Sequence, residues 1–302
     1  MKYHYYTCDV FTQTRFGGNP LAVLPNADGL SDHQMQQITR EFNYSETAFV
    51  FPPEIGHTRK VRIFTPAREV PFAGHPNVGT AFVLATIGEL GDVRSLSEIT
   101  FEEKAGLVPI SLRTLNGKVT ACELRAPEPV SFGQTVSASL IASALSLAQE
   151  DILTGAHEPQ VVSVGLPFVV TELANRSALE RCRANTEGFA NILGVLKGGA
   201  RASVYLYVRT TEEVDVRARM FAPLSGVLED PATGSATCAV VGLLTHLNKQ
   251  ESGEFTYHLA QGVEMGRPSA LRGRAEKSNG TVTATWVGGS CVMVSEGFIH
   301  VD

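Results

Sequence analysis

Short motifs recur through the chain at a nearly constant spacing. The segment RIFTP at 62–66 returns as RMFAP at 219–223, an offset of 157 residues. The sequence PFAG at 71–74 precedes one apolar run, and PATG at 231–234 precedes another at an offset of 160. GNPLAV at 18–23 parallels GLPFVV at 165–170 at an offset of 147. Because the matches keep the same order, they predict a duplicated architecture.

Composition and charge limit the partners that this chain can have. Its 302 residues are 43% hydrophobic, which is enough for two domains at about 150 residues each. The net charge of −6 argues against a nucleic-acid partner, since phosphate binding needs clustered Lys and Arg. The most basic stretch, 267–277, is expected to be a solvated turn. No apolar run is long enough to cross a membrane, and residues 1–11 do not read as a signal peptide.

The cysteines and the absent motifs narrow the chemistry. Cys8, Cys122, Cys182, Cys238 and Cys291 are far apart and form no Cys-x-x-Cys pair, so neither a disulfide framework nor a zinc site is favoured. A reducing, cytoplasmic location fits this usage. Cys238 lies one turn inside an apolar run and is expected to be packing. The chain has no GxGxxG, Walker or HExxH motif, so we expect no cofactor and no metal.

The pattern of apolar residues predicts many short strands and few helices. Segments rich in β-branched and aromatic residues, bounded by Gly, Pro or Asn, are typical of strands. A helix is expected over 31–42, where Ser31 can cap and Asn43 can end it. The runs at 77–87 and after Gly234 are too uniformly apolar for surface helices, so we expect both to be buried. Strands are expected at 3–10, 21–24, 47–51, 60–64, 160–164, 168–172, 202–208, 215–221, 257–260, 270–276, 281–287 and 290–301, and a further helix near 177–183.

Each predicted half ends in a glycine-led apolar helix, and this suggests a binding geometry. The first turn of a helix has unpaired N–H groups and the positive end of the macrodipole, so it stabilises a carboxylate or phosphate. Gly74 and Gly234 would let a ligand approach the backbone closely, although each alone is as well explained as a turn residue. The duplication therefore predicts a cleft between two domains, with both helix starts facing it.

Four motifs in a fixed order identify a family resemblance. They are FGGNPLAV at 16–23, SETAFV at 45–50, PFAGHP at 71–76 and EDPATGSA at 229–236. Together they resemble the phenazine-biosynthesis PhzF family over essentially the whole chain. The resemblance implies the diaminopimelate-epimerase-like α+β fold, with two pseudo-symmetric domains that are each a β-barrel wrapped around a central apolar helix. We expect one domain at 1–124, completed by 288–302, and the other at 125–287.

The same resemblance implies the site residues. Glu46 of SETAFV would be the acid/base that removes a proton from one carbon and returns it to another. His75 of AGHP and Asp230 of EDPATGS would be further catalytic groups, and Gly74, Gly234 and Ser235 would bind the substrate. Taken alone, these residues have ordinary explanations: a solvated strand carboxylate, a core or capping histidine and a turn aspartate.

The function expected from these residues is that of a cofactor-independent isomerase acting on a small carboxylate, of the dihydro-hydroxyanthranilate type in the family's namesake. An amino-acid racemase of the same fold is an alternative, disfavoured because the two cysteines that such racemases carry at the helix starts are absent here. A small-carboxylate-binding protein without turnover is the other alternative. The resemblance also implies a homodimer, whereas the expectation of no nucleic-acid or membrane partner rests on the net charge and on the lack of a long apolar run.

Overall fold

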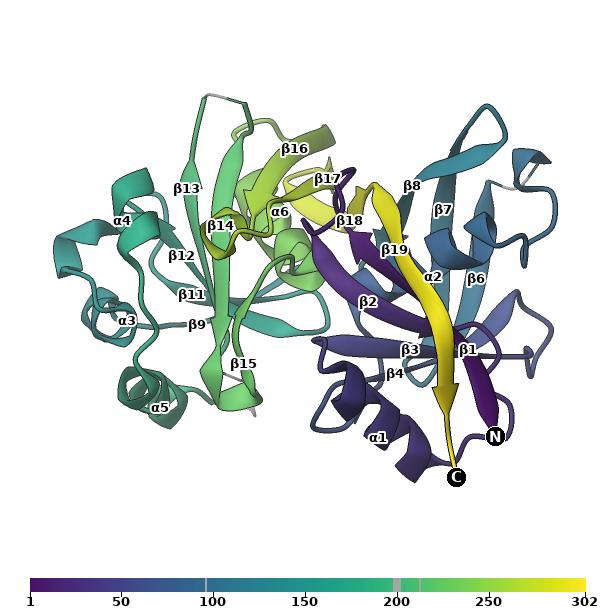
Figure 1. The fold of residues 1–302 in the computed structure, drawn as a ribbon. Coiled ribbons are helices and arrows are strands. Elements are labelled where there is room, and N and C mark those ends of the chain that lie inside the picture. Colours follow the sequence, from purple (N-terminus) through teal and green to yellow (C-terminus); the bar gives the residue numbers. More distant parts are fainter. Residues whose placement is uncertain (96, 198–201, 212) are drawn as a thin grey trace. The chain divides into compact units, whose positions relative to one another are not determined.

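A computed structural model describes residues 1–95, 97–197, 202–211 and 213–302. The chain forms two compact units, Met1–Arg125 with Gly288–Asp302 and Ala126–Val287. The sequence predicts domains at 1–124 with 288–302 and at 125–287. Within each unit, strands surround one long apolar helix (Figure 1). None of the helices in the described ranges is both long and apolar enough to cross a membrane.

In the N-terminal unit, the strands pack around helix α2 (Gly74–Thr86), which contacts β1, β2, β3, β7, β8 and β19. The C-terminal strand β19 pairs with β1, so the last strand of the chain completes the first unit (Figure 1). The β2–β3 and β4–β6 pairs are parallel, and the other neighbours are antiparallel. The strand order is β19 (Cys291–His300), β1 (Lys2–Val10), β2 (Asn19–Leu24), β3 (Glu46–Phe51), β4 (Arg59–Phe64), β6 (Glu98–Glu103), β7 (Gly106–Leu115) and β8 (Lys118–Arg125), with β5 (Glu69–Val70) beside β4.

In the C-terminal unit, the same arrangement surrounds helix α6 (Gly234–Leu247), which contacts β11, β12, β16 and β17. Here β12–β13 and β14–β16 are the parallel pairs. The strand order is β9 (Ser131–Thr135), β11 (Gln160–Ser163), β12 (Pro167–Leu173), β13 (Val204–Arg209), β14 (Val216–Ala222), β16 (Gly253–Gln261) and β17 (Ser269–Ser278), with β10 (Ile152–Leu153) beside β12 and β15 (Val227–Asp230) beside β14. The chain passes from this unit to the first within β18 (Thr281–Gly289).

Strand register confirms the predicted duplication residue by residue. Thr47 on β3 pairs with Phe64 on β4, and at the same offset of 157 Val204 pairs with Phe221. The match extends to the parallel pairs.

In those pairs, Arg59 lies opposite Phe101, and its counterpart Val216 lies opposite Leu259. Phe101 on β6 and Leu259 on β16 therefore occupy equivalent positions.

The repeated RIFTP and RMFAP motifs each supply one half of an ion pair. Arg62 holds Glu69 in a two-point contact, Nε to Oε1 at 2.8 Å and Nη2 to Oε2 at 2.9 Å. Arg219 holds Glu229 in the same way, at 2.7 and 2.8 Å. Each glutamate lies a few residues before the turn that opens the central helix, so this bidentate geometry fixes both turns.

Helix α1 (Asp32–Phe42) agrees with its sequence signals. Ser31 caps it in a capping box with Gln34, and Asn43 ends it in the left-handed conformation. Helix α2 begins three residues earlier than the sequence predicts, at Gly74, because Pro76 is tolerated within a first helical turn. His75 is consequently part of the helix rather than of the loop before it.

Two expectations were incomplete or wrong. No element was expected between 88 and 160, yet this region holds β6 to β10 and helix α3 (Ala138–Leu145). The basic stretch 267–277 is largely strand β17 rather than a solvated turn. The pleat buries alternate residues: Lys277 is 5% exposed and donates to two carbonyls, and Arg274 packs over Trp286.

Candidate active site

The N-terminal unit brings two of the predicted catalytic residues together. Glu46 is the first residue of β3, and His75 is the second residue of α2. Glu46 Oε2 lies 3.6 Å from His75 Nδ1, and the two side chains are 19% and 5% exposed. A strand start and a helix start thus place a partly accessible carboxyl group against a buried imidazole.

Asn19 orders this pair, and the sequence analysis did not single it out. It is fully buried at the start of β2, and its Oδ1 accepts a hydrogen bond from Ser45 Oγ at 3.1 Å. Its amide nitrogen therefore faces His75 Nδ1, at 3.4 Å. Nδ1 of His75 thus lies close to both the Asn19 amide nitrogen and Glu46 Oε2, and Nε2 has no hydrogen-bond partner among the described residues.

Burial decides the charge of His75. Removal from water lowers its pKa to about 3, from an ordinary value of 6.5, and the carbonyl of Pro20 offsets only part of that effect. The imidazole is therefore neutral at physiological pH. A neutral imidazole does not form an ion pair with the carboxyl group beside it, so Glu46 is not held in its ionised form by a charge on His75.

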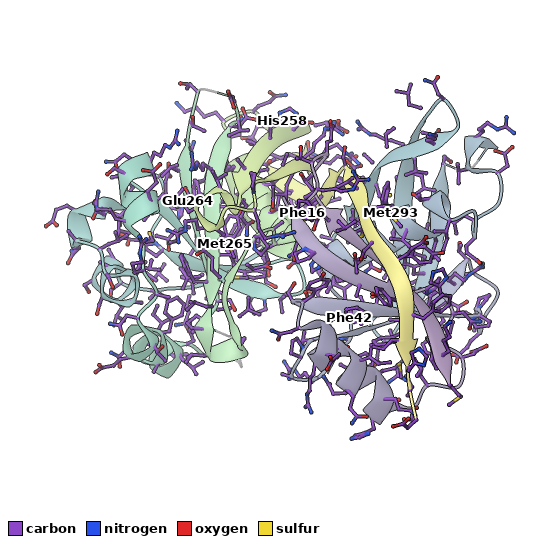
Figure 2. All side chains as sticks on the ribbon, viewed as in Figure 1. Phe16, Phe42, His258, Glu264, Met265 and Met293 are labelled. Atoms are coloured by element: carbon purple, nitrogen blue, oxygen red, sulfur yellow. The ribbon has the colours of Figure 1, made fainter. Side chains whose placement is uncertain are left out.

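The loop before Asn19 is held tightly. Phe16 has a positive φ of 70° and a ring that is 71% exposed, and its N–H donates to Asp9 Oδ2 at 2.6 Å (Figure 2). Gly18 also has a positive φ, and a Cβ there would lie 2.3 Å from the carbonyl oxygen of Val10. Only glycine fits that position, so Gly18 is needed for the chain to place Asn19 at the start of β2.

In the C-terminal unit, Asp230 belongs to a buried polar turn. It ends β15 and is 7% exposed, and its Oδ2 accepts a hydrogen bond from the hydroxyl of Thr233. Gln261, which the sequence analysis also missed, donates to the carbonyl of Asp230 at 2.8 Å. Gly234 and Ser235 follow directly as the first two residues of α6.

The two central helices differ from the others at their N-termini. Ala73 has no side chain that could cap α2, and Thr233 makes no capping hydrogen bond to α6. Every other α-helix in the described ranges has a capping side chain. These caps are Ser31 on α1, Ser137 on α3, Asn175 on α4 (Arg176–Arg181) and Asn185 on α5 (Thr186–Val195).

The cysteine thiols lie in the interior of the protein. All five cysteines are buried. Burial raises the pKa of Cys182 and of Cys291 to about 12, and those of Cys8 and Cys122 well above the ordinary value. Within the described residues, no three His, Cys, Asp or Glu side chains are grouped as metal ligands.

Comparison with known proteins identifies the family. The family model described as phenazine biosynthesis-like protein, PhzC-PhzF, matches residues 8–297. An uncharacterized isomerase of Mesorhizobium japonicum is 37% identical over 99% of both chains. The trans-2,3-dihydro-3-hydroxyanthranilate isomerase of Pseudomonas aeruginosa is 34% identical over 98% of both. A crystal structure of a PhzF-family phenazine biosynthesis protein from Bacillus anthracis superposes with a TM-score of 0.89 at 26% identity, covering 100% of both chains. The chain is therefore an isomerase of the PhzF family, with the α+β fold that its motifs predicted.

Proposed function

We propose that this isomerase moves a proton between two carbons of a small cyclic carboxylate, without a cofactor, and that Glu46 carries the proton. The observation that supports this most directly is the 3.6 Å approach of Glu46 Oε2 to Nδ1 of a buried, neutral His75. Several relatives are named trans-2,3-dihydro-3-hydroxyanthranilate isomerase, so a substrate of that type is the first to test.

The proposed reaction has two proton transfers. The Glu46 carboxylate takes a proton from one substrate carbon, and the electron pair of that C–H bond stays in the substrate as a delocalised anion. The protonated Glu46 then gives the proton to a different carbon, which restores the carboxylate. His75 stays neutral beside Glu46 throughout, so no ion pair competes with these transfers.

The substrate's carboxylate needs a binding group, and the helix starts are suited to that role. Gly74 and Gly234 open the two helices that lack a capping side chain, so their first-turn N–H groups are available to an anion. In this proposal Ser235 adds a hydroxyl donor at the start of α6, and Asp230 is a further catalytic group. Both roles are carried over from the matching motifs.

The test is deuterium exchange into trans-2,3-dihydro-3-hydroxyanthranilate in D₂O, followed by NMR. Glu46→Gln removes the proton carrier but keeps the side chain's shape, so exchange should fall by at least about 10²- to 10⁴-fold while substrate binding stays. The matched control is Glu41→Gln on the exposed side of α1, which should exchange at the wild-type rate. Wild-type exchange in Glu46→Gln would exclude Glu46, and binding without exchange in the wild type would point to a non-catalytic carboxylate binder.

A further inference from the structure

The duplication pairs a glutamate in one unit with a glutamine in the other. Phe101 and Leu259 occupy equivalent positions in the two parallel strand pairs. Two residues further along, at the ends of β6 and β16, are Glu103 and Gln261. The N-terminal unit therefore has a carboxyl group at the position where the C-terminal unit has an amide.

Gln261 shows what this position does in the C-terminal unit. It is fully buried, and its Oε1 accepts from the N–H of Thr233 at 3.1 Å. Its Nε2 donates to the Asp230 carbonyl at 2.8 Å and to Thr233 Oγ1 at 3.0 Å. A neutral group that is both donor and acceptor thus holds the turn that opens α6.

Glu103 ends β6 close to the corresponding turn of the N-terminal unit, because the N–H of Ala105, two residues further on, donates to the carbonyl of Pro71 at 3.1 Å. It is beside Asn77 in the first turn of α2, and Asn77 Nδ2 donates to the carbonyl of Ala73 at 3.0 Å. In the sequence, His75 lies between Ala73 and Asn77. Neither carboxyl oxygen of Glu103 has a hydrogen-bond partner in the described parts of the chain, and neither has Asn77 Oδ1.

The surroundings of Glu103 favour its neutral form. Burial raises its pKa to about 8, and Asn77 lowers it by less. Glu103 also lines a cavity of about 360 Å³ through which water can exchange its proton. The cations there have other partners: Lys60 pairs with Glu54, Arg62 with Asp32 and Glu69, and Lys104 with Glu69.

The surroundings of the neighbouring Glu102 favour its ionised form instead. It accepts hydrogen bonds from the backbone N–H groups of Glu54 at 2.6 Å and of Ile55 and His57 at 3.0 Å. Those donors hold its pKa below the ordinary value although desolvation opposes them. The two adjacent glutamates on β6 therefore differ: Glu102 is an ionised carboxylate that accepts backbone hydrogen bonds, whereas the carboxyl group of Glu103 has no such donors.

We propose that Glu103 is a positioning residue that stays protonated, and that as a neutral carboxylic acid it takes the place of Gln261 close to the turn that carries His75. A carboxylic acid has the amide's shape and, like it, one donor and one acceptor side. Loss of its proton to water at alkaline pH removes the donor and leaves an unpartnered charge beside α2. The first turn of α2 is then disturbed, and His75 with it.

The first test compares the melting of Glu103→Gln with that of the wild type from pH 5 to 9. Folded wild type keeps a proton that the unfolded chain releases above about 4.5, so its stability falls as pH rises to about 8 and then levels off. Glu103→Gln should fold and lack this loss, so its melting temperature should gain on the wild type between pH 5 and 8. Glu102→Gln is the control and should lose stability at neutral pH. A constant difference between Glu103→Gln and wild type would overturn the proposal.

Two further measurements need no substrate, so they judge Glu103 even if the proposed reaction is wrong. In wild-type protein with ¹³C-carboxyl glutamate, one resonance should titrate near pH 8, and its absence would overturn the proposal. The His75 imidazole resonance should shift over the same pH range in the wild type but not in Glu103→Gln. An identical shift in both proteins would reject the positioning role.

The activity measurement rests on the proposed function. Alkaline loss of turnover near pH 8 in the wild type should be absent from Glu103→Gln, and an unchanged loss would exclude Glu103 as its cause. Gln261→Glu is the reciprocal variant. It should melt further below the wild type at pH 9 than at pH 5, because an ionised Glu loses both donors of the amide; equal differences would argue against a shared role for positions 103 and 261.

Discussion

At the scale of single residues, burial keeps His75 of the N-terminal unit neutral. Its Nδ1 lies 3.6 Å from Glu46 Oε2 and 3.4 Å from the amide nitrogen of Asn19, whose amide oxygen accepts from Ser45 Oγ. An imidazole that carried a charge would attract the Glu46 carboxylate and hold it as an ion pair. The neutral ring leaves Glu46 free to change its protonation state.

The lowered pKa of His75 makes a prediction about acid stability. The unfolded chain takes up a proton at this position as pH falls through about 6.5, whereas the folded chain does so only near 3. His75 therefore contributes a loss of stability that grows as pH falls through that interval. In scanning calorimetry, the melting temperature of His75→Asn minus that of the wild type should increase as the pH is lowered from 7 to 4.

The control for that prediction is His33→Asn, at an exposed position of α1. Its melting temperature should keep a constant difference from the wild type across the same pH range. A constant difference for His75→Asn as well would mean that His75 is not held neutral by the fold.

At the scale of elements, the two Arg–Glu pairs are equivalent in sequence but differ in burial. The Arg219 side chain is 5% exposed and also donates to the carbonyls of Leu179 and Cys182. Arg62 is 21% exposed and shares its charge with the exposed Asp32. The same motif thus forms a buried ion pair in the C-terminal unit and a partly solvated ion pair in the N-terminal unit.

This difference predicts unequal costs. Arg219→Met leaves a largely buried Glu229, whose side chain is 13% exposed, and two carbonyls without their partner, so the free energy of unfolding should fall by about 3 kcal/mol. Arg62→Met should cost about 1 kcal/mol, since water can replace the lost partner. Urea denaturation of both variants measures the difference, and equal losses would contradict it.

The elements also show where sequence patterns are informative. Ser31 and Asn43 bounded α1 because a cap acts locally. The repeated motifs indicated the duplication because Arg62 and Arg219 each hold a glutamate before a central helix. The β7–β8 hairpin was missed although Asn116-Gly117 at its turn, with both φ positive, is a strong hairpin signal. The same dipeptide, Asn279-Gly280, recurs between β17 and β18.

The candidate site was less accessible from sequence than the fold. The motifs supplied Glu46, His75 and Asp230, but no local pattern marks Asn19 or Gln261 as partners of those residues. Each acts through contacts between elements distant in sequence, such as the start of β2 against α2. Their roles therefore emerge only once strand order and register are known.

At the scale of the whole molecule, each unit depends on which strand closes it. β9 pairs with β11 inside the C-terminal unit, whereas β19 returns from the end of the chain to pair with β1. Ending the chain after Val287 removes that pairing and uncovers an edge of the N-terminal unit. Hydrogen exchange should then show faster exchange in β1 and β2, while β12 and β13 stay protected. Unchanged protection of β1 would contradict this dependence.

The β1–β19 ladder also sets an order of events during synthesis. Tyr3 pairs with Ile299, so β1 is translated long before the strand that it pairs with along this edge. Residues 126–287 contain their own strand partners and are complete earlier. Because contacts between residues far apart in sequence form late, the half translated second should be the half that folds first. Until β19 is made, the edge of β1 that does not face β2 is an open strand edge on which nascent chains can aggregate.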